Sequence, residues 1–153
     1  MREHTHVSMF DDPTCRCTEQ EAINLDVITR YRMANVSERA PFLAPGYRRH
    51  RAGFLHLGEL WGGKGLKDDT LTDRRFVLVH LEPRGDTVFG IWRVTGTQTG
   101  DFYGVPPTGK PLDVVEVGLW RLEDELITEA WYFGDGLGVL RQLGVNPPDL
   151  SGS

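Results

Sequence analysis

The chain has 153 residues, of which 39% are hydrophobic and 25% are charged, and its formal net charge is −5. This length predicts one domain with a single core, and the balance of apolar and charged residues excludes wholesale disorder. The negative net charge gives no electrostatic reason to expect a nucleic-acid partner. No apolar run is long enough for a membrane span or a signal peptide, so we expect no membrane partner and a cytoplasmic protein.

The first residues contain two histidines and two cysteines in an H-x-H…C-x-C arrangement, at His4, His6, Cys15 and Cys17. Such side chains can hold a metal ion, but short irregular termini are usually poorly ordered. We therefore interpret residues 1–17 as a flexible tail with incidental thiols and expect no metal site.

A first helix is predicted to begin at Thr18, because the sequence Thr18-Glu19-Gln20-Glu21 forms a capping box. The helix should end near Asn35. Its buried stripe is marked by apolar residues at helical spacing, namely Ile23, Val27, Ile28 and Tyr31. A second short helix is expected over 37–44, then a basic extended segment over 47–51, and a weak helix or loop over 58–67.

Four runs rich in β-formers follow, over 75–82, 87–96, 113–122 and 126–133. Turn residues at 83–86 and 123–125 predict two antiparallel hairpins, with a long Gly/Pro-rich loop over 96–110 between them. A final helix over 137–143 should be capped by Asp135 and ended by Gly144.

Helices first and strands afterwards predict an α+β domain over 18–145, with a flexible tail over 146–153. We expect a curved antiparallel sheet of four to six strands that wraps around the N-terminal helices and encloses an apolar pocket. The run over 114–120 has one aliphatic face and one mixed face. The mixed face carries Glu116, Gly118 and Trp120, and we expect it to be the inner face, where any chemical site should lie.

Several motifs carry a family resemblance. Residues 92–100 read WRVTGTQTG, residues 104–110 read GVPPTGK, and residues 120–122 and 127–131 read WRL and ITEAW. In these motifs the chain resembles the SnoaL-like polyketide cyclase family. The resemblance implies a ketosteroid-isomerase-like cone, with a sheet curved around a pocket. It also implies a homodimer or higher homo-oligomer formed through the outer face of the sheet.

The aldol cyclases of that family have an Asp immediately after the Trp that matches Trp131. They also have a His two positions before the residue that matches Trp120. This chain has Tyr132 and Gly118 at those positions, and Gln98 at the position of a loop His. The cyclase mechanism therefore does not transfer unchanged. A Tyr, with an ordinary pKa of about 10, is a poor base near neutrality but a competent hydrogen-bond donor.

The candidate catalytic residues are Glu116 and Tyr132, which should share the inner face, and His50, whose ordinary pKa suits an acid or base at the pocket mouth. We expect Gly118 to leave room for a ligand ring. The other candidate ligand-binding residues are Trp120, Trp92 and Gln98. The competing interpretation places the aromatic residues in the core, Glu116 in solvent and His50 on a solvated basic edge.

The pattern favours a small cofactor-free enzyme of secondary metabolism with an apolar or aromatic small-molecule ligand. It would cyclise, isomerise or ring-open a polycyclic or apolar intermediate by acid–base catalysis. Two alternatives stay open. One is a non-catalytic protein that binds or sequesters a small molecule in the same pocket, and the other is a cofactor-independent, hydroxylase-like relative.

Overall fold

The computed structural model describes residues 17–53, 67–102 and 104–146. Most of both predicted tails, the histidine–cysteine set except Cys17, and nearly all of segment 58–67 lie outside the described residues. The boundaries of the predicted domain therefore stay predictions. None of the described helices is long and apolar enough to cross a bilayer.

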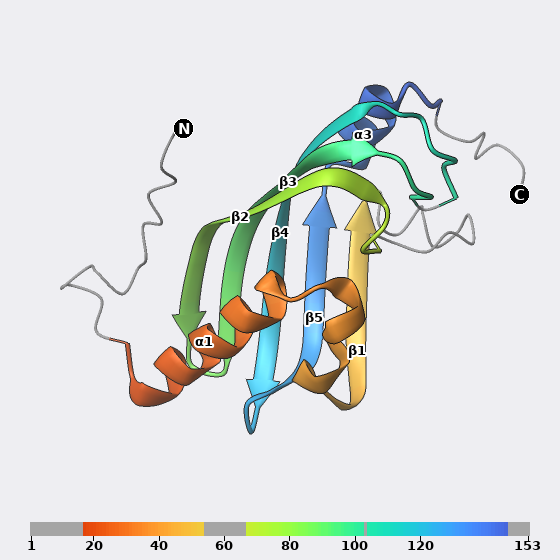
Figure 1. The fold of residues 1–153 in the computed structure, drawn as a ribbon. Coiled ribbons are helices and arrows are strands. Elements are labelled where there is room, and N and C mark those ends of the chain that lie inside the picture. Colours follow the sequence, from red (N-terminus) through yellow and green to blue (C-terminus); the bar gives the residue numbers. More distant parts are fainter. Residues whose placement is uncertain (1–16, 54–66, 103, 147–153) are drawn as a thin grey trace, which may run out of the picture.

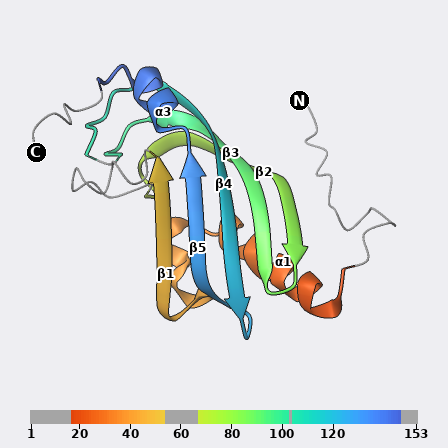
Figure 2. The same cartoon turned by 180° about the vertical axis from the view of Figure 1, so that it is seen from behind.

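The fold is a curved five-stranded sheet with helix α1 (Glu19–Met33) across its concave face (Figure 1). The strands lie side by side in the order β1-β5-β4-β3-β2. Helix α3 (Gly136–Leu143) lies at one end of the sheet, and in the view from behind neither of the described α-helices covers the outer face (Figure 2). The strand bounds are β1 (Leu43–Gly53), β2 (Leu71–Arg84), β3 (Thr87–Gln98), β4 (Pro111–Glu123) and β5 (Leu126–Gly134).

The predicted α+β class is confirmed, with one difference in the sheet. The pairs β2–β3, β3–β4 and β4–β5 are antiparallel, as expected, but β1 runs parallel to β5, so the sheet is mixed. The helical layer returns the chain to the end of the sheet where β5 begins, and β1 starts beside it, with Leu43 opposite Ile127. The basic segment over 47–51 is the middle of this strand.

The capping box of α1 is confirmed. The Thr18 hydroxyl accepts from the backbone N–H of Glu21 at 3.2 Å, and the Glu21 carboxylate accepts from the backbone N–H of Thr18 at 2.9 Å. The same carboxylate accepts from the N–H of Gly85 at 2.8 Å, which ties the start of the helix to the β2–β3 turn. The second helix expected over 37–44 is instead two short 3₁₀ turns, Val36–Glu38 and Ala40–Phe42.

Strand β2 begins earlier than predicted and contains two irregularities, which explain its curvature in Figure 1. The register with β3 shifts between Thr72 and Arg75 and again between Leu78 and His80. Asp73 has a φ of 51°, so the first shift places a non-glycine residue in the left-handed region. Bulges of this kind bend a strand and increase its twist, and here they curve the sheet over α1.

The inner face of β4 is the mixed one, as predicted. Gly118 and Trp120 are buried and Glu116 is half-buried, whereas Val115 on the other face is 53% exposed. The Trp120 ring packs against that of Trp92 on β3, with 5.5 Å between ring centroids. These two indoles form the layer that lines the concave face of the sheet.

Gly118 does not leave room for a ligand ring. A Cβ atom at this position would lie 2.9 Å from atoms of both Trp92 and Trp120, so the two indoles already occupy the space above it. Gly90, directly opposite on β3, has the same role, since a Cβ there would lie 2.8 Å from the Trp120 ring. The glycine pair is therefore a packing requirement of the indole layer.

Gly118→Ala should destabilise the protein by about 1–3 kcal/mol, because an overpacked core has to shift its neighbours. Urea unfolding followed by circular dichroism measures the change. Gly134→Ala is the matched control on β5, because a Cβ there would make only an ordinary contact, 3.6 Å from Cγ of Glu116. Equal losses of stability in the two variants would contradict this packing role.

Candidate functional site

A cavity of about 310 Å³ lies between the helical layer, strand β1 and the inner face of the sheet, and we call it the central cavity. This volume is at the small end of the range for small-molecule sites. Aromatic and aliphatic groups line part of it, as expected, but four arginines add a cationic component that the sequence analysis did not predict. The lining residues are Tyr31, Arg32, Val36, Arg39, Ala40, Leu43, Tyr47, Arg49, Arg51, Trp92, Glu116 and Tyr132.

Glu116 supplies a carboxylate to this cavity. The indole N–H of Trp92 donates a hydrogen bond to its Oε2 at 2.7 Å, which fixes the orientation of the carboxylate. Glu116 forms no ion pair with any residue that the structure describes. Arg74 interacts with it electrostatically without forming an ion pair, so Glu116 is a carboxylate that could serve as a proton acceptor.

Tyr132 lies on the same inner face and is only 7% exposed. Its hydroxyl accepts a hydrogen bond from the indole N–H of Trp120 at 3.0 Å and lies 3.1 Å from the hydroxyl of Tyr31 on α1. Glu116 pairs with Gly134, two residues beyond Tyr132, so Glu116 and Tyr132 are diagonal neighbours on adjacent strands. Such neighbours have Cα atoms about 7–8 Å apart, so both side chains can contact one small molecule in the cavity.

The phenols of the cavity keep their protons at neutral pH. Burial is the main cause that raises the pKa of Tyr31 and that of Tyr132, and burial raises the pKa of Tyr47 to about 12. The Tyr47 hydroxyl is buried beside Tyr132 but has no hydrogen bond of acceptable geometry within the described chain. The cavity thus combines one carboxylate that can act as a base with phenols that can donate hydrogen bonds.

Arg32 was not among the predicted site residues. It lies on the buried stripe of α1, one turn after Ile28, and is only 7% exposed. Its guanidinium lies over the Trp92 ring, 3.9 Å from the centroid, and its Nε is buried without a hydrogen-bond partner in the described chain. An arginine at a stripe position of an amphipathic helix is the signal in the sequence that could have identified it.

A second arginine, Arg39, lies beside Arg32. Its Nε donates to the carbonyl of Ala34 at 3.2 Å, and its Nη2 donates to the carbonyl of Arg32 at 3.3 Å. Burial and then the positive charge of Arg32 lower the pKa of Arg39 to about 10. The repulsion shows that two guanidinium groups share the same poorly solvated wall of the cavity.

The candidate ligand-binding residues separate into different roles. Trp92 lines the central cavity, whereas Trp120 is fully buried behind Tyr132 and orients its hydroxyl. Gln98 is also fully buried and is not among the lining residues. Its Nε2 lies within hydrogen-bond distance of the carbonyls of Gly100, Val105 and Pro106, and its Oε1 accepts from Thr108. Gln98 therefore organises the loop after β3.

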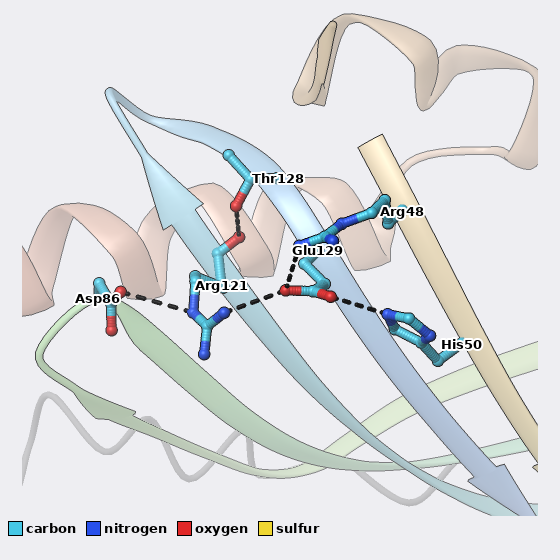
Figure 3. A network of polar contacts seen from close by, with 6 residues as sticks. All are labelled: Arg48, His50, Asp86, Arg121, Thr128 and Glu129. Carbon is cyan, nitrogen blue, oxygen red and sulfur yellow. Dashed lines mark hydrogen bonds and ion pairs between the residues drawn. The ribbon is translucent and has the colours of Figure 1, made fainter. Parts of the chain in front are cut away.

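His50 lies on the opposite face of the sheet. Side chains alternate along β1, so its neighbours Arg49 and Arg51 line the cavity and His50 points away from it. Its ring stacks on Trp131 with 5.1 Å between centroids. Figure 3 shows its Nε2 pointing to Oε1 of Glu129, at a distance of 2.8 Å. The structure therefore does not bring His50 together with Glu116 and Tyr132.

Glu129 is the centre of this outer network (Figure 3). Besides His50, its carboxylate contacts Arg48 at 3.1 Å and Arg121 at 3.0 Å, and its side chain is 8% exposed. The hydrogen bond from His50 is the largest of the interactions that lower the pKa of Glu129, and both arginines act in the same direction. A carboxyl group whose pKa is lower in the folded than in the unfolded chain stabilises the fold above its unfolded pKa.

Glu129→Gln should reduce the loss of stability in acid. In the native protein the contribution of this carboxylate is lost as the pH falls through the lowered pKa, below about pH 5. The variant should therefore melt earlier than the native protein at pH 7, and its Tm should fall less between pH 6 and pH 3. Differential scanning calorimetry across that range tests this.

Glu82→Gln is the matched control, because Glu82 also lies beside a histidine, 3.5 Å from His80, but is 64% exposed. Exposed pairs contribute little, so this variant should retain the native pH profile. Parallel profiles for Glu129→Gln and the native protein would contradict the role given to Glu129.

Within the described residues, no three side chains of the metal-ligating types gather closely enough to hold a metal ion.

No curated protein shows a significant sequence match to the chain. Among solved structures, a candidate SnoaL-like polyketide cyclase from Jannaschia sp. CCS1 is 23% identical, with a TM-score of 0.68 over 87% of this chain and 99% of that chain. AclR, a candidate hydroxylase from Streptomyces galilaeus, is 21% identical, with a TM-score of 0.61 over 87% of each chain.

IdmH from Streptomyces antibioticus, a candidate polyketide cyclase, is 22% identical, with a TM-score of 0.57 over 80% of this chain and 99% of that chain. A neighbour from Burkholderia thailandensis is named as an NTF2-like protein, which agrees with the cone fold. At such identities these likenesses establish the fold alone. The model of the SnoaL-like polyketide cyclase family, however, matches residues 65–143, just over half of the chain. The chain therefore belongs to the SnoaL-like polyketide cyclase family.

Proposed function

We propose that this protein is an enzyme of secondary metabolism that binds a small polycyclic or largely apolar intermediate in the central cavity and acts on it by proton transfer. The outcome would be cyclisation, isomerisation or ring opening. The observation that carries this proposal is the Glu116 carboxylate, which lines the cavity, is oriented by the Trp92 indole and forms no ion pair with a described residue. Membership of the cyclase family supports the same class of chemistry.

In the proposed reaction Glu116 takes a proton from a substrate carbon next to a carbonyl group. The electron pair of the broken C–H bond moves onto the carbonyl oxygen, and the Tyr132 hydroxyl donates a hydrogen bond to that developing oxyanion. Return of the proton from Glu116 to another carbon completes an isomerisation. Attack of the carbanion on a second carbonyl carbon, followed by protonation of the resulting alkoxide, completes a cyclisation.

In this assignment the catalytic base lies at a different sequence position from that of the aldol cyclases that the chain resembles. Positions 118 and 132, where those enzymes have a His and an Asp, are directly opposite each other on β4 and β5. Glu116 is two residues before Gly118 on the same strand, so it shares the inner face with both positions. A carboxylate at 116 can therefore reach the space in front of Tyr132.

Glu116→Gln should abolish turnover, because an amide cannot accept the proton while its shape and its hydrogen bond from Trp92 persist. The measurement is exchange of the α-hydrogens of 2-tetralone in D₂O, followed by NMR, with the buffer rate subtracted. We expect the enzyme-dependent rate to fall by about 10²–10⁴-fold, the usual contribution of a general base.

Glu123→Gln is the matched control on the same strand, because Glu123 is exposed at the β4–β5 turn. It should exchange the probe at the native rate, and circular dichroism confirms the fold of each variant. Exchange at the native rate in Glu116→Gln would remove Glu116 from the mechanism.

A ligand-binding role without turnover is the alternative, and a specific observation favours it: the Asp and His of the aldol cyclases are Tyr132 and Gly118 in this chain. The exchange experiment separates the two functions. A native protein that binds the probe, as seen by quenching of tryptophan fluorescence, but never exchanges its hydrogens would support the binding role. A hydroxylase-like reaction, the third possibility, would consume oxygen.

We also propose a homodimer formed through the outer face of the sheet. Val115 is 53% exposed and Phe133 is 50% exposed on this face, and Val117, which pairs with Phe133, is half-buried between them. An apolar area of this kind, on a sheet face that no described helix covers, is typical of a protein interface.

Val115→Glu should convert the dimer into a monomer, because a second copy would have to bury the new charge. Sedimentation equilibrium measures the mass. Leu137→Glu is the control, since Leu137 is equally apolar and 63% exposed but lies on α3. A native protein that is monomeric at micromolar concentration would refute the proposed dimer.

A further inference from the structure

Two hydrogen-bond donors on the wall of the central cavity are buried without acceptors. Nε of Arg32 and the hydroxyl of Tyr47 have no hydrogen-bond partner within the described chain, and both residues line the cavity. Buried donors are almost always satisfied in folded proteins, and leaving one unsatisfied is costly. Neither atom reaches the cavity surface itself, but an anionic ligand in the cavity would offset the buried positive charge of Arg32.

The positive charge of the arginines that line the cavity favours a ligand with a negatively charged group. Arg32 forms no ion pair with a described carboxylate, and its guanidinium contacts the face of the Trp92 ring, which supplies no hydrogen-bonding oxygen. Arg39, next to it, forms no ion pair with a described residue either and donates only to backbone carbonyls. Arg49 and Arg51, on β1, also line the cavity and have interactions of their own.

We infer that the substrate carries a carboxylate, and that the cavity holds this group against the guanidinium groups of Arg32 and Arg39. A carboxylate has the planar pair of oxygens that matches the fork of an arginine. Its negative charge would offset the repulsion between the two guanidinium groups. A phosphate dianion fits less well, because the Glu116 carboxylate, which lines the same cavity, repels two charges more strongly than one.

The inference rests on the proposed function, because it concerns the same cavity. It also predicts how the substrate is oriented there. With its carboxylate held at Arg32, the body of the substrate would lie along Trp92 toward Glu116, since the Trp92 ring contacts Arg32 through its face and Glu116 through its N–H. A carboxylate anchored at Arg32 would thus position the reacting carbon beside Glu116.

The experiment compares an acid with its amide. The probes are 2-naphthoate and 2-naphthamide, which have the same rings and nearly the same shape but differ in charge, and binding is measured by isothermal titration calorimetry at pH 7. The native protein should bind 2-naphthoate at least about tenfold more tightly than 2-naphthamide, since a hydrogen bond between charged groups is stronger than a neutral one.

In Arg32→Gln this preference should fall to about twofold or less, while the affinity for 2-naphthamide stays within about twofold of the native value. The control is Arg30→Gln, which removes the same charge from the same helix at an exposed position, where Arg30 pairs with Asp26. It should keep the full preference for the acid. Unfolding curves for both variants show whether the fold persists, and Arg32→Lys, which keeps the charge, should retain part of the preference.

Equal or tighter binding of the amide by the native protein would overturn the inference, as would failure of both probes to bind. Tighter binding of 2-naphthyl phosphate than of 2-naphthoate would also overturn it, in favour of a phosphate ligand. The binding experiment and the test of the proposed function have independent outcomes. Glu116→Gln should bind 2-naphthoate at least as tightly as the native protein, whether or not Glu116 is a catalytic base. Acid-selective binding without any hydrogen exchange would therefore refute the catalysis and leave the anion site standing.

Discussion

The contact between the indoles of Trp92 and Trp120 is the interaction on which the site depends. The two rings fill the concave side of the sheet, and they fit only because Gly90 and Gly118 lie beneath them as a cross-strand pair. Each indole also donates a hydrogen bond through its N–H group. The N–H of Trp92 orients Glu116 and the N–H of Trp120 orients Tyr132, so one packing unit holds both proposed catalytic groups.

This arrangement connects the core to the chemistry of the cavity. The guanidinium of Arg32, which is buried on α1, lies over the Trp92 ring at 3.9 Å and is also 5.8 Å from the centroid of the Trp120 ring. A charged group is tolerated there because an aromatic face attracts a cation, although the contact leaves its Nε without an acceptor. The same indole thus links a cation, a carboxylate and the sheet. A ligand that bridges Arg32 and Glu116 would lie along its surface.

Membership of the SnoaL-like family explains the scaffold but leaves the reaction open. The positions of the Asp and His in the aldol cyclases are Tyr132 and Gly118 here, and the structure shows what replaces them: a buried phenol whose proton is retained, and a packing glycine. Strand alternation then makes Glu116 the carboxylate that faces the same space. The four arginines on the wall set this cavity apart from the apolar pocket that the family resemblance implied.

The sequence by itself determined the class of the fold and most of its elements, because those depend on local patterns. The capping box at Thr18, the hairpin turns, the alternation along β4 and the cap at Asp135 each act within a few residues, and each is found where it was predicted. The faces of β4 could be assigned from polarity alone. Glu116 and Tyr132 were brought together correctly by the same period of two.

The tertiary structure decided what depends on partners distant in the chain. The basic run around His50 has no alternating apolar residues, so only the parallel pairing of β1 with β5 shows that His50 faces Glu129 outside while Arg49 and Arg51 face inward. The space above Gly118 looked empty because its occupants come from positions 92 and 120. Its position on the buried stripe of α1 marked Arg32 as unusual in the sequence, but only the tertiary structure shows that its guanidinium lies over Trp92 and lines the cavity.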